Sequence, residues 1–142
     1  MAPDTLRLHG TAVAFDGKGV LIIGASGRGK SSLALQLMAF GCQLVSDDQT
    51  VLTRRGDDLW ASAPETIRGL IEARGVGVLR AEAVEAAIGL IIDLDQTEPH
   101  RLPRRHEVDY LGLTRPCLHH VDAVAWPAAI VQYLKAGREE PQ

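Results

Sequence analysis

The sequence is poor in cysteine, in aromatic residues and in long apolar runs. Its 142 residues include two cysteines, and aromatic residues make up 4% of the chain. Cys42 and Cys117 stand too far apart for a metal-binding cysteine motif, which predicts reduced thiols. No apolar run reaches the roughly 20 residues of a membrane-spanning helix, and the first residues lack the basic and apolar regions of a signal peptide. We therefore expect a soluble, cytoplasmic protein.

The chain also lacks an excess of positive charge. Its formal net charge is −3 and its pI is about 5.9, whereas proteins that bind nucleic acids or acidic membranes carry basic patches. We expect neither nucleic acid nor a membrane as a partner. Hydrophobic residues make up 46% of the sequence, so the chain can bury a substantial core, and its length is that of a single domain.

The most informative stretch is a glycine-rich turn between an apolar run, residues 20–23, and an amphipathic segment, residues 30–40. The turn consists of Gly24, Ala25, Ser26, Gly27, Arg28, Gly29, Lys30 and Ser31, which is the GxxxxGKS pattern of a phosphate-binding P-loop. A chance Lys-Ser after a glycine turn is the alternative, but the strand and the helix predicted on its two sides are what a P-loop requires. The glycines let the backbone approach phosphates closely, and successive N–H groups form an anion nest at the start of the helix.

The remaining pattern predicts a mixed sheet. We expect strands over residues 6–15, 20–23, 43–48, 50–53, 59–63 and 88–94, a further strand within 111–121, and helices over 30–40 and 127–136. The turn at residues 16–19 is of the hairpin type, which makes the first two strands antiparallel. Residues 64–79 contain too many glycines for a helix and predict a structured loop. Residues 96–110 predict a polar loop with a basic patch.

Two apolar runs end in carboxylates that suit phosphoryl transfer, residues 44–48 (Leu-Val-Ser-Asp-Asp) and residues 90–95 (Leu-Ile-Ile-Asp-Leu-Asp). The reaction needs a metal ligand and a group that orients or deprotonates the nucleophile. The second run has the better shape for a metal-binding strand end. The first follows the P-loop helix directly, so its strand can lie beside the P-loop strand. Spacing alone does not decide which of the two runs supplies the catalytic carboxylates, because either aspartate can simply cap a turn.

Several segments together resemble the catalytic domain of HPr kinase/phosphorylase, a bifunctional bacterial enzyme that phosphorylates a seryl residue of the phosphocarrier protein HPr. They are His9-Gly10, Gly24 to Ser31, Leu44 to Asp48 and Ile71 to Leu79 (IEARGVGVL), with a weaker match at Arg101-Leu102. The resemblance covers most of the chain, and its Glu-x-Arg-Gly-x-Gly segment is specific to this family. It implies an α/β fold, a single P-loop domain with a mixed sheet, arranged as in phosphoenolpyruvate carboxykinase rather than as in Ras.

The resemblance implies how ATP and Mg²⁺ are held. Lys30 and the amides of residues 24–31 would hold the phosphates, with Lys30 at the β- and γ-phosphates. Ser31 and Glu72 would hold Mg²⁺. Taken without the resemblance, Glu72 and Arg74 could form an ordinary ion pair within a loop.

The resemblance also implies which residues act on the acceptor. Asp48 would take the proton of the acceptor serine, which is a weak nucleophile at neutral pH, and Asp47 would support Asp48 or the metal. His9 would contact Asp48 or the phosphate, although a histidine in a strand is commonly structural. Arg101, or another arginine within residues 101–105, would stabilise charge on the transferred phosphate.

The chain departs from the family at several points. It begins at the His-Gly strand, where long members carry a further N-terminal domain, so residues 1–142 match the short form with a catalytic domain alone. Ser32 follows Ser31 where long members have Glu, and residues 115–120 replace the C-terminal segment tied to dephosphorylation and subunit contacts. We therefore expect the kinase reaction and a homo-oligomer, and leave open the phosphorylase reaction and the hexamer of long members.

Two other functions stay open. One is a P-loop kinase of a small hydroxyl substrate. The chain leaves few residues to form a substrate pocket, which argues against this function. The other is a nucleotide-sensing regulator that binds ATP without transferring a phosphoryl group. The presence of Asp48 and Glu72 argues against this function, because a sensor needs no base.

Overall fold

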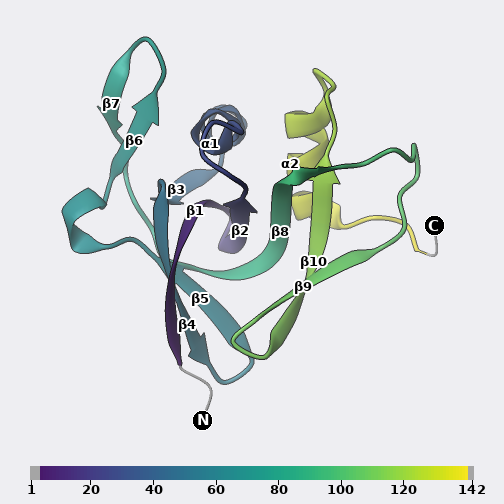
Figure 1. Ribbon diagram of the computed structural model, residues 1–142, viewed down its shortest axis with the longest axis horizontal. Coiled ribbons are helices and arrows are strands. Elements are labelled where there is room, and N and C mark those ends of the chain that lie inside the picture. The colour runs from purple at the N-terminus through teal and green to yellow at the C-terminus, as the bar shows by residue number, and fades with distance from the viewer. Residues whose placement is uncertain (1–3, 141–142) are drawn as a thin grey trace.

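The fold contains far more strand than helix, and both α-helices lie on one side of the main sheet (Figure 1). The computed structural model describes residues 4–140. The elements in chain order are β1 (Thr5–Phe15), β2 (Lys18–Ile23), α1 (Lys30–Ala39), β3 (Gln43–Ser46), β4 (Gln49–Arg55), β5 (Asp58–Ser62), a short 3-10 helix (Glu65–Ile67), β6 (Leu70–Ala73), β7 (Gly77–Arg80), β8 (Ala86–Thr97), β9 (His106–Tyr110), β10 (Leu113–His120) and α2 (Trp126–Ala136). Neither of the two helices described in residues 4–140 is long and apolar enough to cross a membrane.

The first hairpin is as predicted. β1 and β2 are antiparallel, with Phe15 opposite Lys18, so that the loop is two residues long. Asp16 and Gly17 have φ values of 49° and 79°. Positive φ at both positions is what a type I′ turn requires, and this turn matches the twist of the flanking strands. The strand that leads into the P-loop therefore starts from a locally determined hairpin.

The sheet closes on itself beneath the P-loop. Its order is β2-β1-β4-β5-β8-β10-β9, and β2 also pairs with β8, while β3 pairs with the second half of β1. The strands β1, β2, β4, β5 and β8 thus form a ring. β8 runs parallel to β2 and to β10, and the other pairs are antiparallel. This arrangement confirms the mixed sheet.

Apolar side chains fill both faces of the sheet. One cluster lies between the sheet and the helices, and it includes Leu33 and Leu37 of α1 and Ile130 of α2. The other lies within the ring and includes Leu52 and Ile91. Burying a leucine or isoleucine of this kind stabilises the fold by about 1.5–3 kcal/mol. The cores hold α1 against the sheet, with its N-terminus beside the glycine-rich turn.

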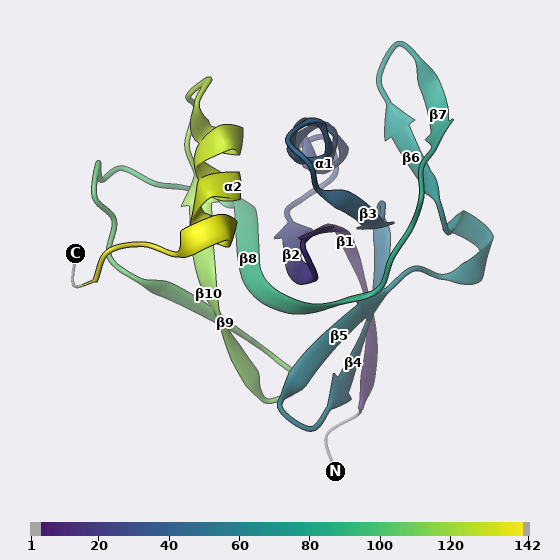
Figure 2. The same cartoon turned by 180° about the vertical axis from the view of Figure 1, so that it is seen from behind.

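Three sequence-based expectations were wrong in detail. Phe40 lies beyond the end of α1 and is 52% exposed, so it does not continue the buried stripe of Leu33 and Leu37. Residues 70–80 form an antiparallel hairpin that projects from the sheet (Figures 1 and 2), because positive φ at Gly75 and Gly77 reverses the chain between β6 and β7. Residues 106–110 form β9, an edge strand whose alternation of polar and partly buried residues resembles a loop in sequence.

Candidate active site

The glycine-rich turn follows β2 and leads into α1, as a P-loop does. Gly24, Gly27 and Gly29 all have positive φ, and Gly29 is the N-cap of the helix. The ammonium group of Lys30 donates to the carbonyl oxygens of Gly24 at 2.8 Å and of Ala25 at 3.2 Å, so this buried cation is satisfied by its own loop. The first turn of α1 contains no acidic residue. The positive end of the helix is therefore left for an anion.

A cavity of about 360 Å³ opens over this turn. It is polar and collects residues from four parts of the chain: His9, Ser26, Gly27, Gly29, Lys30, Ser31, Ser32, Asp48, Glu72 and Arg74. The fold thus brings together most of the residues predicted for phosphate binding, metal binding and proton transfer. Arg101 is not among them.

The turn between β3 and β4 places two adjacent carboxylates in opposite surroundings. The amide of Gln49 donates to the carbonyl oxygen of Asp47 at 2.8 Å, which closes the turn tightly. Asp48 sits at φ 69°, a left-handed conformation that aspartate tolerates better than most residues. As a result Asp47 is 7% exposed, whereas the side chain of Asp48 is 65% exposed. One carboxylate faces the interior and the other faces the cavity.

Asp47 joins three elements through its carboxylate. Its Oδ1 accepts hydrogen bonds from the hydroxyl groups of Ser31 at 2.6 Å and of Thr11 at 3.0 Å. Its Oδ2 accepts a bond from the amide of Glu72 at 3.0 Å. Asp47 therefore orients the P-loop serine and fixes β6, which carries Glu72. The sequence predicted only a supporting role for Asp47, although its place directly after the three buried residues that end β3 is a signal for a larger one.

Asp48 is paired with His9. Nε2 of His9 lies 2.8 Å from Oδ1 of Asp48, and both side chains are about half exposed. The backbone of Asp48 is tied to β1, because its amide donates to the hydroxyl of Thr11 at 3.2 Å and its carbonyl oxygen accepts the amide of Gly10 at 3.0 Å. Of the two contacts predicted for His9, the contact with Asp48 is present.

The second acidic run, rather than the first, lies beside the P-loop strand. β8 pairs with β2, whereas β3 pairs with β1. The carboxylate of Asp95 accepts the amide of Ala25 at 3.0 and 3.1 Å and pairs with Nε of Arg28 at 3.2 Å. Oδ1 of Asp93 accepts the amide of Asp95 at 2.9 Å. These two aspartates hold the first turn of the P-loop and do not line the cavity.

Two arginines are placed differently from expectation. Arg101 belongs to the loop between β8 and β9 and lines a separate cavity of about 620 Å³, beside Trp126 and Tyr133 of α2. Arg74 lines the P-loop cavity with Glu72. Within residues 4–140, the salt bridges do not include one between Glu72 and Arg74. Arg74 is thus the arginine that the fold brings to this cavity.

The chain is similar to known proteins over most of its length. The family model of the HPr serine kinase C-terminal domain matches residues 1–123. The chain is 38% identical over 131 residues to the HPr kinase/phosphorylase of Brevibacillus brevis, and 42% identical over 122 residues to that of Alkaliphilus metalliredigens. These matches cover 86% and 80% of this chain, but 40% and 38% of the relatives, so the chain spans about two fifths of their length.

A solved structure is also similar. It is described as the structure of the Hpr(Ser) kinase/phosphatase from Coxiella burnetii, and it matches with a TM-score of 0.76 and 26% sequence identity. The match covers 92% of this chain and 94% of that one. The likeness therefore extends over nearly the whole fold.

Proposed function

The chain belongs to the family of the HPr serine kinase C-terminal domain, and we propose that it transfers the γ-phosphate of ATP to a seryl residue of HPr or a paralogous phosphocarrier protein. Residues 1–142 act in this proposal as one catalytic domain, in the cytoplasm and as a homo-oligomer. The observation that carries the proposal is that the P-loop and the exposed carboxylate of Asp48 open into one cavity.

The phosphate side of the cavity suits Mg-ATP. The N-terminus of α1 and the amides of the glycine-rich turn bind the phosphates, except those of Ala25 and Arg28, which donate to Asp95 and to the Ala25 carbonyl oxygen. Lys30 adds a fixed positive charge. The oxygen donors of Ser31 and Glu72 fit Mg²⁺, since this ion prefers oxygen ligands, and the Ser31 hydroxyl keeps its lone pairs free while it donates to Asp47. Mg²⁺ bound there would neutralise charge on the β- and γ-phosphates.

The acceptor side of the cavity suits a serine on a protein surface. Asp48 accepts the proton of the seryl hydroxyl, the seryl oxygen forms a bond to the γ-phosphorus, and the bond to the β–γ bridging oxygen breaks to release ADP. His9 orients the carboxylate through its 2.8 Å contact. The exposed guanidinium of Arg74, rather than that of Arg101, stabilises charge on the transferred phosphate.

Exposure favours a protein acceptor over a small molecule. The side chain of Asp48 is 65% exposed, whereas kinases of small substrates exclude water around the reacting groups. The hairpin β6–β7 stands next to the cavity and carries Val76 and Val78, which are 74% and 66% exposed. Apolar side chains exposed in this way are typical of surfaces that contact another protein.

The test is transfer of labelled γ-phosphate from Mg-ATP to purified HPr-type proteins, with mapping of the modified residue. We expect phosphoserine with the unchanged chain, and none with Lys30→Ala or Asp48→Asn. Asp58→Asn, at an exposed aspartate on the hairpin β4–β5, is the matched control and keeps full activity. Adding inorganic phosphate to the product tests the reverse, phosphorylase reaction.

Two results would overturn the proposal. ATP binding without transfer to any HPr-type protein would favour a nucleotide-sensing regulator. Label on a small hydroxyl compound, with none on HPr, would favour a small-molecule kinase.

A further inference from the structure

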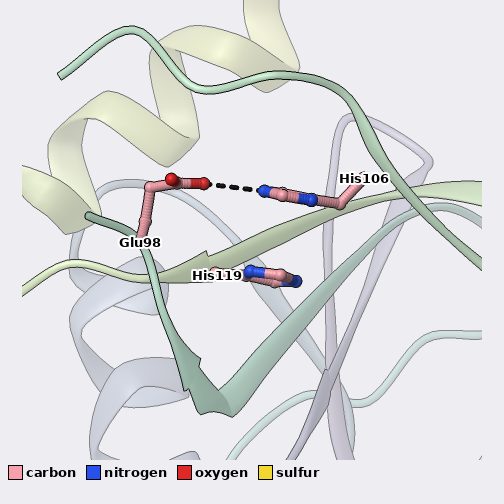
Figure 3. Close-up of side chains that lie close together, drawn as sticks. All are labelled: Glu98, His106 and His119. Carbon is pink, nitrogen blue, oxygen red and sulfur yellow. Dashed lines mark hydrogen bonds and ion pairs between the residues drawn. The ribbon is translucent and has the colours of Figure 1, made fainter. Parts of the chain in front are cut away.

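Two histidines and a glutamate meet at one end of the sheet, away from the P-loop. Glu98 directly follows β8, His106 begins β9, and His119 lies near the end of β10. They converge because β10 pairs with both neighbours, parallel to β8 and antiparallel to β9. Figure 3 shows the carboxylate of Glu98 pointing at the edge of the His106 ring, with the His119 ring lying against that of His106.

The three side chains are close enough to share one ion. Oε1 of Glu98 lies 2.8 Å from Nε2 of His106, and the His106 and His119 rings are stacked with centroids 3.8 Å apart. One possible ligand atom from each residue lies within 4.8 Å of the other two. Two ligands at about 2.1 Å from a tetrahedral zinc ion are roughly 3.4 Å apart. An imidazole binds a metal through a lone pair in its ring plane, so the His106 and His119 rings must turn out of their stack to face one ion.

The three side chains are partly shielded from solvent. The Glu98 side chain is 4% exposed and that of His106 is 32% exposed. One carboxylate oxygen and two imidazole nitrogens form a donor set that zinc and related transition metals bind.

We propose that Glu98, His106 and His119 bind one divalent transition-metal ion of the zinc class, with a fourth position open to water. Glu98 and His119 also line the cavity of about 620 Å³, which gives that position access to solvent. Two nitrogen ligands separate this site from the oxygen donors predicted for Mg²⁺. The site is independent of the proposed kinase function.

An ion bound by these three residues would also hold the loop between β8 and β9 in place. Glu98 and His106 stand at the two ends of the loop that carries Arg101, and His119 belongs to the sheet beneath them. An ion bound by all three ties both ends of this loop to β10. Metal binding therefore restricts the loop as well as filling the site.

The first test measures zinc affinity of the tag-free chain by competition with a chromogenic chelator, and Co²⁺ coordination by its visible spectrum. We expect one equivalent, not displaced by millimolar Mg²⁺. Glu98→Gln and His119→Gln should each weaken binding by about tenfold or more. His100→Gln is the control, because His100 is exposed and contributes only its backbone amide to Glu98. Wild-type affinity in both ligand variants, or no binding by the unchanged chain, would overturn the site.

The second test needs no substitution. NMR of the imidazole nitrogens, recorded on the unchanged chain with and without zinc, identifies the coordinating histidines directly. We expect His106 and His119 to shift, while His9, His100 and His120 stay in place. A zinc-dependent shift at His9 alone would place the ion in the P-loop cavity and refute the proposal.

Discussion

The adjacent carboxylates Asp47 and Asp48 should respond to the same substitution in opposite ways. In Asp47→Asn, the amide oxygen can still accept from Ser31 and Thr11, but the amide nitrogen then faces the N–H of Glu72. One hydrogen bond to an ionised acceptor is lost, and two others lose their charge assistance. The expected loss in the free energy of unfolding is about 2–4 kcal/mol.

Asp48→Asn removes much less stability. The carboxylate is exposed and has one ion-pair partner, His9, and exposed pairs of this kind contribute about 0–1 kcal/mol. Asparagine also tolerates the left-handed conformation at this position, so the turn keeps its shape. The expected loss is below about 1 kcal/mol. Under the proposed function, this variant binds ATP but has lost most of its phosphoryl transfer, because only the base is gone.

The measurement is equilibrium unfolding in urea, followed by circular dichroism, together with the transfer assay. A domain of this size has a stability of about 5–15 kcal/mol, so both variants remain folded enough to compare. The reasoning is refuted if Asp48→Asn destabilises the chain more than Asp47→Asn does. Normal transfer by Asp48→Asn would separately remove this residue from the role of base.

Four further predictions concern the P-loop cavity and the two cysteines. Lys30→Ala removes the cation inside the P-loop, so calorimetry should show ATP affinity reduced by about tenfold or more, with transfer abolished. Glu72→Gln should raise the Mg²⁺ concentration needed for half-maximal transfer; an unchanged requirement would remove it from the metal site. Burial raises the pKa of Cys42 and of Cys117 to about 11, so a thiol reagent at about pH 8 should modify them only after unfolding. Their raised pKa also makes the free energy of unfolding fall as pH rises from the ordinary thiol value of 9.0 to about 11, which urea titrations at increasing pH would detect.

Local signals explain what the sequence predicted correctly. The hairpin at Asp16-Gly17 and the P-loop from Gly24 to Ser31 depend on short-range conformational requirements, which a few residues carry. The end of α1 at Gly41 is of the same kind. The P-loop cavity could be anticipated residue by residue only because the resemblance added distant segments to these local ones.

Long-range pairing explains what the sequence did not predict. Nothing local indicates that β8 rather than β3 lies beside β2, so Asp95 was not expected at the amide of Ala25. Glycines mark turns in hairpins and in loops alike, which is why the structured loop predicted over residues 64–79 omits the β6–β7 hairpin. Arg74 and Arg101 are both exposed arginines in polar segments, and only the tertiary structure shows which one reaches the P-loop cavity.

The two-residue turn at Asp47-Asp48 also sets a limit on insertions and deletions. β3 and β4 both pair with β1, with Ser46 opposite Ala12 and Gln49 opposite His9, so the two residues between them keep one register along β1. Inserting one residue there would shift β4 by one position and exchange its faces, which would carry Thr50 and Leu52 from the core to the surface. The β6–β7 loop has no such constraint, since those strands pair only with each other within residues 4–140. Length changes should therefore be accepted at the tip of that hairpin and rejected at the turn between β3 and β4.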